Sequence, residues 1–580
     1  MCSAPVAKIL EPRRAALAQA ASSRGTISGR WYGAPTMSGW TLGASAGAAI
    51  LALPILAILS LALRPTDSIW QHLLSTVLPG ALGNTLLLLI GAGCFSLAIG
   101  TSAAWLVTMY KFPGRGFADR LLVLPLAMPA YIVAYAYVDY LDYAGPVQTQ
   151  LRALIGAKVP NDFWFPQIRS LGGAIFIFTA VLYPYVYLSA RASFAQQSIC
   201  VLEVARTLGR TALGTFWSVA LPMARPALAA GVALVLMECM NDLGAVQYLG
   251  VETLTASIYA TWLQRGNLSG AAQLASVTLM MVFALLIIER AARGDARSHN
   301  TTGRQRAIPF ETLPGWRGYL ALVIVLIPFV LGFAVPFLVL AKQAIAHFQS
   351  SFSAGFVAAA INSLVLAALT CAVAVALALF FGYAARVARG PLTSLSSRAA
   401  ALGYALPGTV LAIGLLIPLA SIDNAMAGWI KAVTGINTGL ILSGSLFAVT
   451  LALVIRFLAV ALGAIDAGLG RISLSLDAAA STLGASALSA LFRVHLPLLA
   501  PALGAAALMV FVDAMKELPA TLLLRPFNFE TLATHIYGLA AAEQFEEAAL
   551  GAITIVLIGL LPVLLLHQAI AEGHKASPGG

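Results

Sequence analysis

The chain has 580 residues, of which 60% are hydrophobic and only 10% are charged, and its formal net charge is +11. Soluble domains usually contain about 45–50% apolar and about 25% charged residues, so this composition excludes an ordinary soluble protein, a disordered chain and a coiled coil. The five cysteines form no CxxC pair and lie mostly in or beside apolar stretches, which favours packing over a disulfide or metal framework. The composition indicates a polytopic membrane protein.

Long stretches without Asp, Glu, Lys or Arg mark the expected membrane spans. A helix needs about 20 apolar residues to cross roughly 30 Å of hydrocarbon. Eleven stretches have at least 18 residues: 31–63, 68–110, 121–138, 170–190, 266–288, 318–341, 343–385, 399–422, 432–455, 494–512 and 548–571. A twelfth span, at about 223–246, contains two carboxylates and is accepted because its pattern recurs later in the chain. The expected fold class is an all-α polytopic membrane protein with about 12 transmembrane helices.

The basic residues predict the orientation of these spans. With the N-terminus inside, 25 of the 34 Lys and Arg residues fall in segments expected on the cytoplasmic side. This bias is the usual determinant of topology, and it predicts a multi-pass membrane protein with both termini cytoplasmic. The positive charge is therefore a topology signal, and no nucleic-acid motif accompanies it.

The chain repeats itself once. Residues 221–226 (LPMARP) recur at 496–501 (LPLLAP), an offset of 275, while NTL at 84–86 recurs as NSL at 362–364, an offset of 278. Each half carries six expected spans, so the halves are predicted to be parallel repeats. The predicted organisation is an N-terminal tail (1–38), a first repeat (39–291), a cytoplasmic linker (292–317), a second repeat (318–571) and a C-terminal tail (572–580).

A polar loop occurs at the same place in each half. Between spans 4 and 5 the chain reads EVARTLG at 203–209, then nine residues, then VALP at 219–222. We expect a short helix over about 199–208 that ends at Gly209, because glycine adopts positive φ without steric cost. Pro222 suits the first turn of the next span, where its missing N–H has no partner. By itself the loop could equally be a simple membrane-skirting connection.

The repeated loop resembles the EAA loop of binding-protein-dependent ABC importer permeases, whose pattern is E-A-A, three residues, G, nine residues, I-x-L-P. The first EAA loop (199–222) departs by having Val204 in place of the first Ala and Val219 in place of Ile, and the second (474–497) has Ala478 in place of Glu, directly after Asp477. The resemblance implies the type I ABC permease fold, in which each loop is a coupling helix that fits a groove on an ATPase subunit. The coupling residues it implies are Glu203, Ala205, Gly209, Leu221 and Pro222, and Asp477, Ala479, Gly484, Leu496 and Pro497.

The ATPase is expected to be a separate protein. A phosphate-binding P-loop needs Gly-Lys followed by Ser or Thr, and none of the seven lysines follows a glycine. The chain is therefore not expected to be an enzyme or to hold a cofactor, since ATP and Mg would be bound by partner subunits. The resemblance implies two such ATPase subunits and a periplasmic substrate-binding protein as partners.

Two pairs of carboxylates follow the EAA loops. Glu238 and Asp242 lie 16 and 20 residues after Pro222, and Asp513 and Glu517 lie 16 and 20 residues after Pro497. A spacing of four places each pair on one helix face. At about 1.5 Å per residue they lie roughly 24–30 Å from the cytoplasmic end. Ionisable groups at membrane depth are candidates for a transport path, and the alternative is structural pairing with Lys516, Asn241 or a helix end.

A tyrosine-rich segment follows the third span. Residues 129–146 contain five tyrosines and two aspartates, and Tyr131, Tyr135, Asp139 and Asp142 are candidates for the substrate path or for docking of the binding protein. Hard oxygen ligands would suit a ferric ion. The alternative is an aromatic belt at the membrane interface.

This segment, together with 241–250 and 516–537, resembles the fused permeases of ferric-iron importers, and the resemblance covers roughly residues 80–570. It implies ferric iron as the substrate, while thiamine or polyamines remain alternatives because their permeases share the architecture. Carboxylates argue against sulfate or phosphate, which favour arginines or helix N-termini. A secondary transporter of the major-facilitator type is a distant alternative, since the loop at 111–120 lacks the D-R-x-G-R-R order typical of that family.

Overall fold

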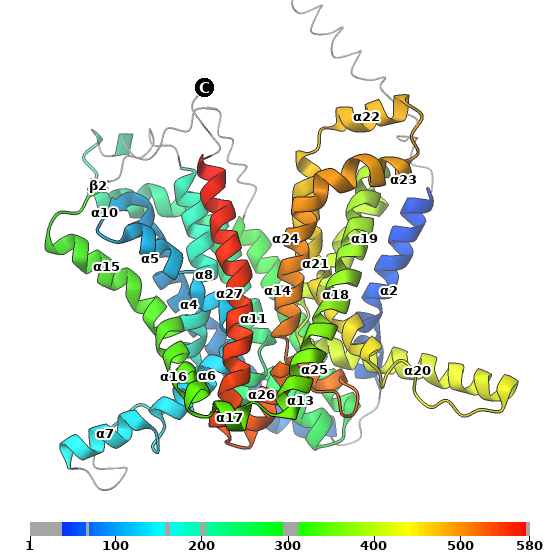
Figure 1. The fold of residues 1–580 in the computed structure, drawn as a ribbon, viewed down its shortest axis with the longest axis horizontal. Coiled ribbons are helices and arrows are strands. Elements are labelled where there is room, and N and C mark those ends of the chain that lie inside the picture. Colours follow the sequence, from blue (N-terminus) through cyan, green and yellow to red (C-terminus); the bar gives the residue numbers. More distant parts are fainter. Residues whose placement is uncertain are drawn as a thin grey trace, which may run out of the picture. The chain divides into compact units, whose positions relative to one another are not determined.

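A computed structural model describes residues 38–64, 69–156, 163–197, 204–205, 207–293 and 311–575. Within this part of the chain, 11 helices are long and apolar enough to cross a membrane, or up to 12 if the bent pair Arg115–Ala127 and Ala130–Ile155 forms one span. The expected all-α membrane fold with about 12 transmembrane helices is confirmed (Figure 1).

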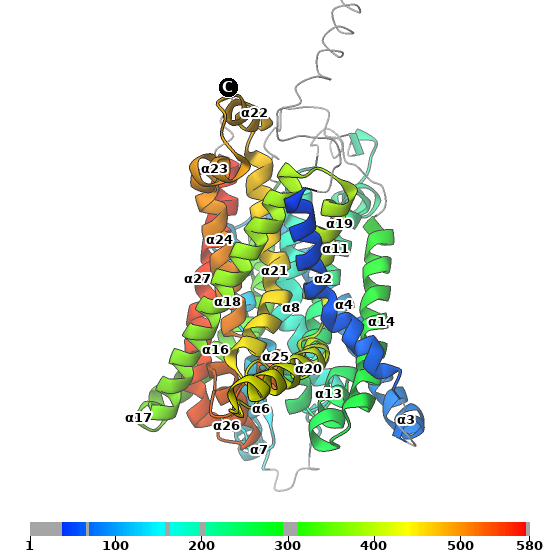
Figure 2. The ribbon, with the colours of Figure 1, turned by 90° about the vertical axis from the view of Figure 1, so that its right-hand side faces the viewer.

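The first half contains five of the long apolar helices and the bent pair, with short helices between them. Its elements are α2 (Gly39–Ala62), α3 (Ile69–His72), η1 (Leu73–Val77), α4 (Leu78–Met109), β1 (Tyr110–Lys111), α5 (Arg115–Leu121), η2 (Leu124–Ala127), α6 (Ala130–Leu141), α7 (Pro146–Ile155), α8 (Leu171–Ala195), α10 (Ala212–Thr215), η4 (Phe216–Ala220), α11 (Leu221–Asn241), α12 (Gly244–Tyr248), α13 (Leu254–Tyr259), η5 (Ala260–Gln264) and α14 (Leu268–Arg293). Figure 2 shows α4, α8 and α14 running in the same general direction.

The second half follows the same order. Its elements are β2 (Glu311–Thr312), α15 (Trp316–Phe329), η6 (Val330–Ala334), α16 (Val335–Ala346), α17 (Phe348–Ser351), α18 (Ala354–Val387), α19 (Pro391–Ala400), η7 (Ala401–Ala405), α20 (Gly408–Thr434), α21 (Leu446–Arg471), α22 (Leu474–Thr482), α23 (Ala487–Ala490), η8 (Leu491–His495), α24 (Leu496–Met515), α25 (Pro519–Leu524), α26 (Leu532–Ala541) and α27 (Phe545–Lys575). The strand β2 pairs in parallel with β1.

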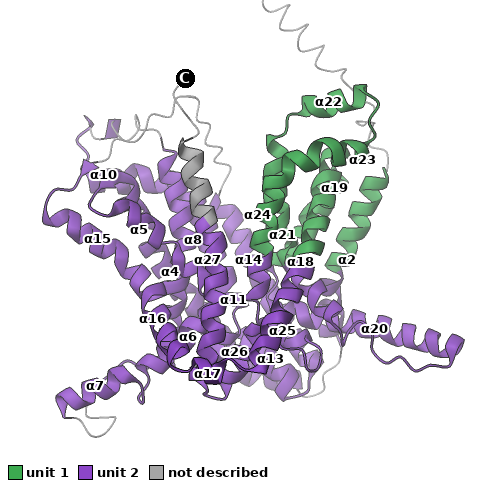
Figure 3. Cartoon of the chain, in the orientation of Figure 1, with its two compact units in different colours: residues 1–52, 371–404, 457–510 green, residues 53–370, 405–456, 511–580 purple. Residues whose placement is uncertain are grey.

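The chain divides into two compact units (Figure 3). Unit 1 comprises residues 1–52, 371–404 and 457–510, and unit 2 comprises 53–370, 405–456 and 511–580. Glycines let helices approach closely within each unit, as is usual in membrane bundles. In unit 2 a Cβ on Gly100 of α4 would lie 2.9 Å from Tyr183 O of α8, and in unit 1 a Cβ on Gly468 of α21 would lie 2.7 Å from Ala502 of α24.

The repeated sequence motifs contact each other in the same way in both halves. In each half an asparagine amide of the second span donates to a glutamate carbonyl, and the neighbouring hydroxyl accepts a backbone N–H. The bonds are Asn84 Nδ2 to Glu252 O (3.0 Å) and Leu254 N to Thr85 Oγ1 (3.0 Å), then Asn362 Nδ2 to Glu530 O (2.9 Å) and Leu532 N to Ser363 Oγ (2.7 Å). The internal repeat is therefore a structural repeat.

The third span of the first half is broken. The helical segments on either side of the break, Arg115–Ala127 and Ala130–Ile155, meet at 95°. Pro129 is the N-cap of α6, and Pro407 occupies the same position before α20. Proline lacks an N–H and disfavours helix in the residue before it, so each proline separates two helical segments. The span expected over 121–138 is therefore not a single helix, because the chain bends at Pro129.

The expected spans 399–422 and 432–455 were also misplaced. The structure has α20 to Thr434 and α21 from Leu446, with Gly435 and Gly439 at positive φ between them. Helix α20 continues through Asp423 and Lys431 and ends at its C-cap Gly435, inside the charge-free stretch 432–455. Arg456 was counted among the cytoplasmic basic residues, but it lies inside α21. There it forms an ion pair with the buried carboxylate of Glu517.

Candidate functional site

The second EAA loop forms the expected short helix. Helix α22 begins after Ser473, whose hydroxyl accepts the N–H of Ser475. It ends before Gly484, which has φ +78°, and Ala485 N donates to Ala480 O at 3.0 Å. This is the bond with which a left-handed residue closes a helix.

The first EAA loop repeats this helix end. Gly209 has φ +82°, and Arg210 N donates to Ala205 O at 3.1 Å. No atom lies within 4 Å of a Cβ built on Gly209 or Gly484, so the backbone conformation rather than space requires glycine at both positions. Glu203 and most of the helix expected over 199–208 lie outside the described residues.

Both loops present apolar side chains to solvent. Leu208 and Leu483 occupy equivalent positions and are 78% and 86% exposed. Val204 and Leu476 are also exposed, as is Ala479, whereas Ala205 is buried. Exposed apolar groups beside a helix end are typical of a surface that binds another protein.

Pro222 and Pro497 lie in the first turn of α11 and α24, as expected, but a π-helical turn joins each of these helices to the short helix before it. Continuous helical stretches run from Ala212 to Asn241 and from Ala487 to Met515, and each includes a π-helical turn, η4 or η8, just before Leu221 or Leu496. A proline inside a helix clashes with the carbonyl four residues earlier. The wider π turn accommodates the proline, so the helix continues through it.

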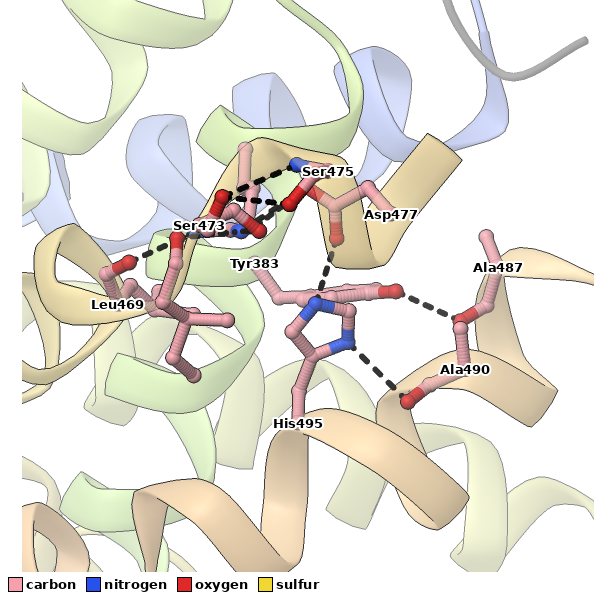
Figure 4. A network of polar contacts seen from close by, with 10 residues as sticks. Tyr383, Leu469, Ser473, Ser475, Asp477, Ala487, Ala490 and His495 are labelled. Atoms are coloured by element: carbon pink, nitrogen blue, oxygen red, sulfur yellow. Dashed lines mark hydrogen bonds and ion pairs between the residues drawn. The ribbon is translucent and has the colours of Figure 1, made fainter. Parts of the chain in front are cut away.

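Asp477 points into unit 1 rather than toward solvent (Figure 4). Its side chain is 3% exposed, and Arg386 of α18 donates to it through Nε (3.0 Å) and Nη2 (2.9 Å). The same guanidinium donates to the carbonyls of Leu469 (2.7 Å) and Ile472 (3.0 Å). Arg386 and Asp477 therefore fasten α22 to the ends of α18 and α21.

His495 lies on the other side of the Asp477 carboxylate (Figure 4). Its Nε2 is 2.6 Å from Asp477 Oδ1 and its Nδ1 is 3.1 Å from Ala490 O, so each ring nitrogen faces an acceptor. An imidazole can donate to both acceptors only when it is protonated. Tyr383 stacks edge-on against the ring and donates to Ala487 O at 2.7 Å. Sequence reasoning missed Arg386 and His495, which are distant from Asp477 in the chain.

The carboxylate pairs after the EAA loops do not stay on one helix face. Asp242 is the C-cap of α11, and its carboxylate accepts Ala245 N at 2.7 Å. Glu517 follows the end of α24 and accepts Ala520 N at 2.8 Å. Both carboxylates bind the free N–H groups at the start of the next short helix, which is why the expected i, i+4 geometry fails.

Glu517 also forms a buried ion pair. Arg456 Nη1 lies 3.1 Å from Glu517 Oε1, and Thr521 donates to the other carboxylate oxygen at 2.7 Å. A Cβ on Gly408 would lie within 3.0 Å of both members of the pair, and Gly408 N donates to Asn241 Oδ1 at 2.9 Å. The N-terminal end of α20 therefore contacts Asn241, the last residue of α11, and Glu517, which follows α24.

The other acidic candidates are also partnered. Asp513 pairs with Lys516 at 2.9 Å, and Asp142 pairs with Arg169 at 3.2 Å. Asp139 accepts a bond from Gln343 at 3.2 Å, and Glu238 also has an interaction partner. Each of these four carboxylates thus has an interaction partner within the fold.

A pocket of about 330 Å³ lies at the C-terminal end of α6, and its lining is charged and of mixed sign. The charged lining residues are Asp139, Asp142, Arg169, Lys342 and Glu543. Sequence reasoning picked out only the two aspartates, because the other residues come from distant stretches. Phe545, at the start of α27, also lines this pocket.

Tyr131 and Tyr135 are not part of an aromatic belt. They are 3% and 4% exposed and lie inside unit 2, with ring centroids 5.7 Å apart. Tyr135 also packs edge-on against Tyr248, at 4.6 Å between centroids. Among the described residues no group of three or more His, Cys, Asp or Glu side chains is arranged to hold a metal ion.

Comparisons with known proteins identify the family. Residues 96–294 match the model of the binding-protein-dependent transport system inner membrane component. The chain is 27% identical over 492 residues to the Fe(3+)-transport system permease protein FbpB 2 of Haemophilus influenzae (84% of this chain, 89% of that protein).

Two further relatives match about two fifths of this chain. The sulfate transport system permease protein CysT of Salmonella typhimurium is 30% identical over 245 residues (41% of this chain, 84% of that protein). The molybdenum transport system permease protein ModB of Escherichia coli K12 is 28% identical over 235 residues (39% and 95%). The two-repeat chain, its paired EAA loops and these similarities lead to one conclusion: the protein belongs to the family of binding-protein-dependent transport system inner membrane components and is a multi-pass permease of an ABC importer.

Proposed function

We propose that this permease imports ferric iron delivered by a periplasmic binding protein, using ATP hydrolysed by two separate ATPase subunits. The observation that carries the substrate is the similarity to an Fe(3+)-transport permease along both halves, over 84% of the chain. By contrast, the sulfate and molybdenum permeases each match about two fifths of this chain.

Each ATPase subunit binds one EAA loop in this proposal. The exposed leucines, Leu208 in the first loop and Leu483 in the second, supply the apolar contact with the ATPase. Closure of the ATPase dimer on ATP moves both loops together. In the second half the movement passes from α22 through Asp477 and Arg386 to α18, because a buried ion pair resists sliding of one element past the other.

The orientation of the permease in the membrane follows from the assignment of the EAA loops as the ATPase contacts. The EAA loops and both termini are cytoplasmic, and the segments that follow α6 and α11 face the periplasm, where the binding protein docks. A reporter enzyme fused after residue 305, in the linker, is expected to show cytoplasmic activity. Periplasmic activity at that position would exclude the proposed topology.

The substrate is tested by uptake of radiolabelled iron in cells that lack only this chain. Uptake should be lost and restored by the wild-type gene, and purified complex in proteoliposomes should hydrolyse ATP faster with iron-loaded binding protein. Parallel assays with sulfate, molybdate, thiamine and a polyamine identify the substrate if iron is not the cargo. Unchanged iron uptake with loss of any one of these would overturn the assignment.

A further inference from the structure

Three tyrosine hydroxyls are buried in unit 2 without a hydrogen-bond partner among the described residues: those of Tyr131, Tyr135 and Tyr248. Buried polar groups in native proteins are nearly always bonded, so such exceptions call for an explanation. A helical Ser or Thr can rotate toward a carbonyl of its own helix. A tyrosine hydroxyl is too far from its own backbone to do so.

Other buried tyrosines of the same unit are bonded. Tyr137 donates to Leu331 O at 2.6 Å, Tyr183 to Leu122 O at 3.0 Å, and Tyr187 to Asp119. The three unbonded hydroxyls are therefore a local feature of one place in the fold rather than a general property of its tyrosines.

The three rings form a continuous row. Tyr131 and Tyr135 have centroids 5.7 Å apart, Tyr135 and Tyr248 4.6 Å, and Tyr248 and Phe545 5.7 Å. Phe545 lines the charged pocket at the end of α6. The row thus runs from that pocket into the interior of the unit.

Carboxylates lie near both ends of this row. Asp139, Asp142 and Glu543 line the pocket beside Tyr248, together with Arg169 and Lys342, and the Arg169 guanidinium lies 4.9 Å from the centroid of the Tyr248 ring. At the inner end Tyr131 packs on Gly244, two residues after Asp242, and a Cβ built on that glycine would also meet Leu518, the residue after Glu517. A cation would therefore meet carboxylate oxygens before and after the row, although Asp142 and Glu517 are each paired with an arginine.

The row occurs in one half only. The equivalent positions of the second half are Thr409, Ile413 and Leu523, two of which have no polar atom in their side chains. Internal repetition therefore does not account for these tyrosines, and the fold does not need their hydroxyls to build this element.

We propose that the hydroxyls of Tyr131, Tyr135 and Tyr248 line the stretch of the transport path through which the cation passes from the pocket toward Asp242. The inference rests on the proposed function and deepens it. Each phenol supplies an oxygen lone pair, and oxygen ligands suit a hard, multiply charged cation such as ferric iron. Because the three hydroxyls bond no other described residue, no hydrogen bond within that part of the chain has to break when the ion enters.

The test replaces each tyrosine by phenylalanine, which removes only the hydroxyl. Y131F, Y135F and Y248F are reconstituted in proteoliposomes with the ATPase subunits and iron-loaded binding protein, and initial iron uptake and the melting temperature are measured. We expect Y135F to reduce uptake about tenfold, since one lost polar contact of roughly 1.4 kcal/mol corresponds to that factor. The melting temperature should stay at the wild-type value or rise, because no bond is lost.

Y137F and Y183F are the matched controls. Each removes a hydroxyl that is bonded to a backbone carbonyl, so each should lower the melting temperature. Their uptake per assembled complex should equal that of the wild type. This opposite pattern separates a transport role from a structural one.

The outcomes distinguish this inference from the proposed function. Iron uptake by the wild type with undiminished uptake by all three Tyr→Phe variants would overturn the inference and leave the substrate standing. Stimulation of ATP hydrolysis by the loaded binding protein should persist in the variants, and its loss would show that the tyrosines act in coupling instead. No iron uptake by the wild type would overturn the proposed substrate itself.

Discussion

The two EAA loops have the same local structure but differ in how the rest of the fold can hold them. Gly209 and Gly484 close their helices with the same backbone bond, and Thr211 and Ser486 cap the next helix in the same way. The buried cluster of Arg386, Asp477 and His495 exists in the second half alone. Its equivalents in the first half are Thr108, Leu202 and Ala220, which carry no charge.

Short-range sequence therefore sets the shape of a coupling loop, whereas ion pairs between distant residues set how firmly the loop is attached. The hydroxyl of Thr108 is buried and bonds nothing among the described residues, while Arg386 at the equivalent position binds Asp477 and several carbonyls. We therefore expect the second EAA loop to be held more rigidly by its own half of the permease than the first loop is.

The largest effect should come from breaking the cluster. Arg386→Gln leaves Asp477 buried with reduced compensation, and removing one partner of a buried pair costs about 3–5 kcal/mol of stability. Thermal unfolding of the purified protein in detergent measures this loss. Thr108→Val, the matched change in the first half, should have no effect because that hydroxyl makes no bond. Equal melting temperatures for the two variants would contradict the comparison.

Gly484→Val and Gly209→Val should have the next largest effect. A left-handed residue other than glycine is strained by about 1–2 kcal/mol, and β-branching adds to this cost. The loop should dock wrongly, so that uptake falls about tenfold while ATP hydrolysis continues. Gly470→Val in α21, where φ is not positive and space is open, is the control. Wild-type transport by the double variant would refute a role for these helix ends.

Glu203→Ala and Asp477→Ala should separate binding from stability. Glu203 is the acidic residue that the EAA pattern places at the ATPase contact, so its loss should weaken ATPase association a few-fold without changing the melting temperature. Asp477 is buried, so its loss should mainly lower the melting temperature. Co-purification of the ATPase and thermal unfolding measure the two effects. Equal losses of ATPase would show that Asp477 substitutes for the missing glutamate.

The smallest expected effects come from removing the helix caps, and these effects should be equal in the two EAA loops. Thr211→Ala and Ser486→Ala each remove one helix cap, a loss of about 1 kcal/mol. Both caps accept a single backbone N–H, from Gly214 and Ser489 respectively, at 3.1 and 3.2 Å. Matching shifts in melting temperature would confirm that local structure is shared. A clear difference between them would show that tertiary attachment also governs the caps.

Errors in the predicted site share one cause. Asp242 and Glu517 were placed on helix faces because a spacing of four is all that the chain displays, yet each carboxylate turns to bind the start of the next short helix. Tyr131 and Tyr135 were weighed as an interfacial belt, but the elements that bury them, among them α12, come from elsewhere in the chain. Side chains that meet from distant parts of the chain leave no periodic pattern in the sequence, so spacing alone does not predict these contacts.

The membrane class, about 12 spans, the internal repeat and the glycine ends of the EAA loops are all predictable from the amino-acid sequence. Each of these depends on local composition or on short spacings, which act through helix geometry and the length of the bilayer. The pairing of buried Arg456 with Glu517, the contacts of Asp477 with Arg386 and His495, and the row of three tyrosine hydroxyls without a hydrogen-bond partner among the described residues come from tertiary packing. Such arrangements depend on which distant side chains meet in a low-dielectric interior, where a charge or hydroxyl is stable or costly according to its partner.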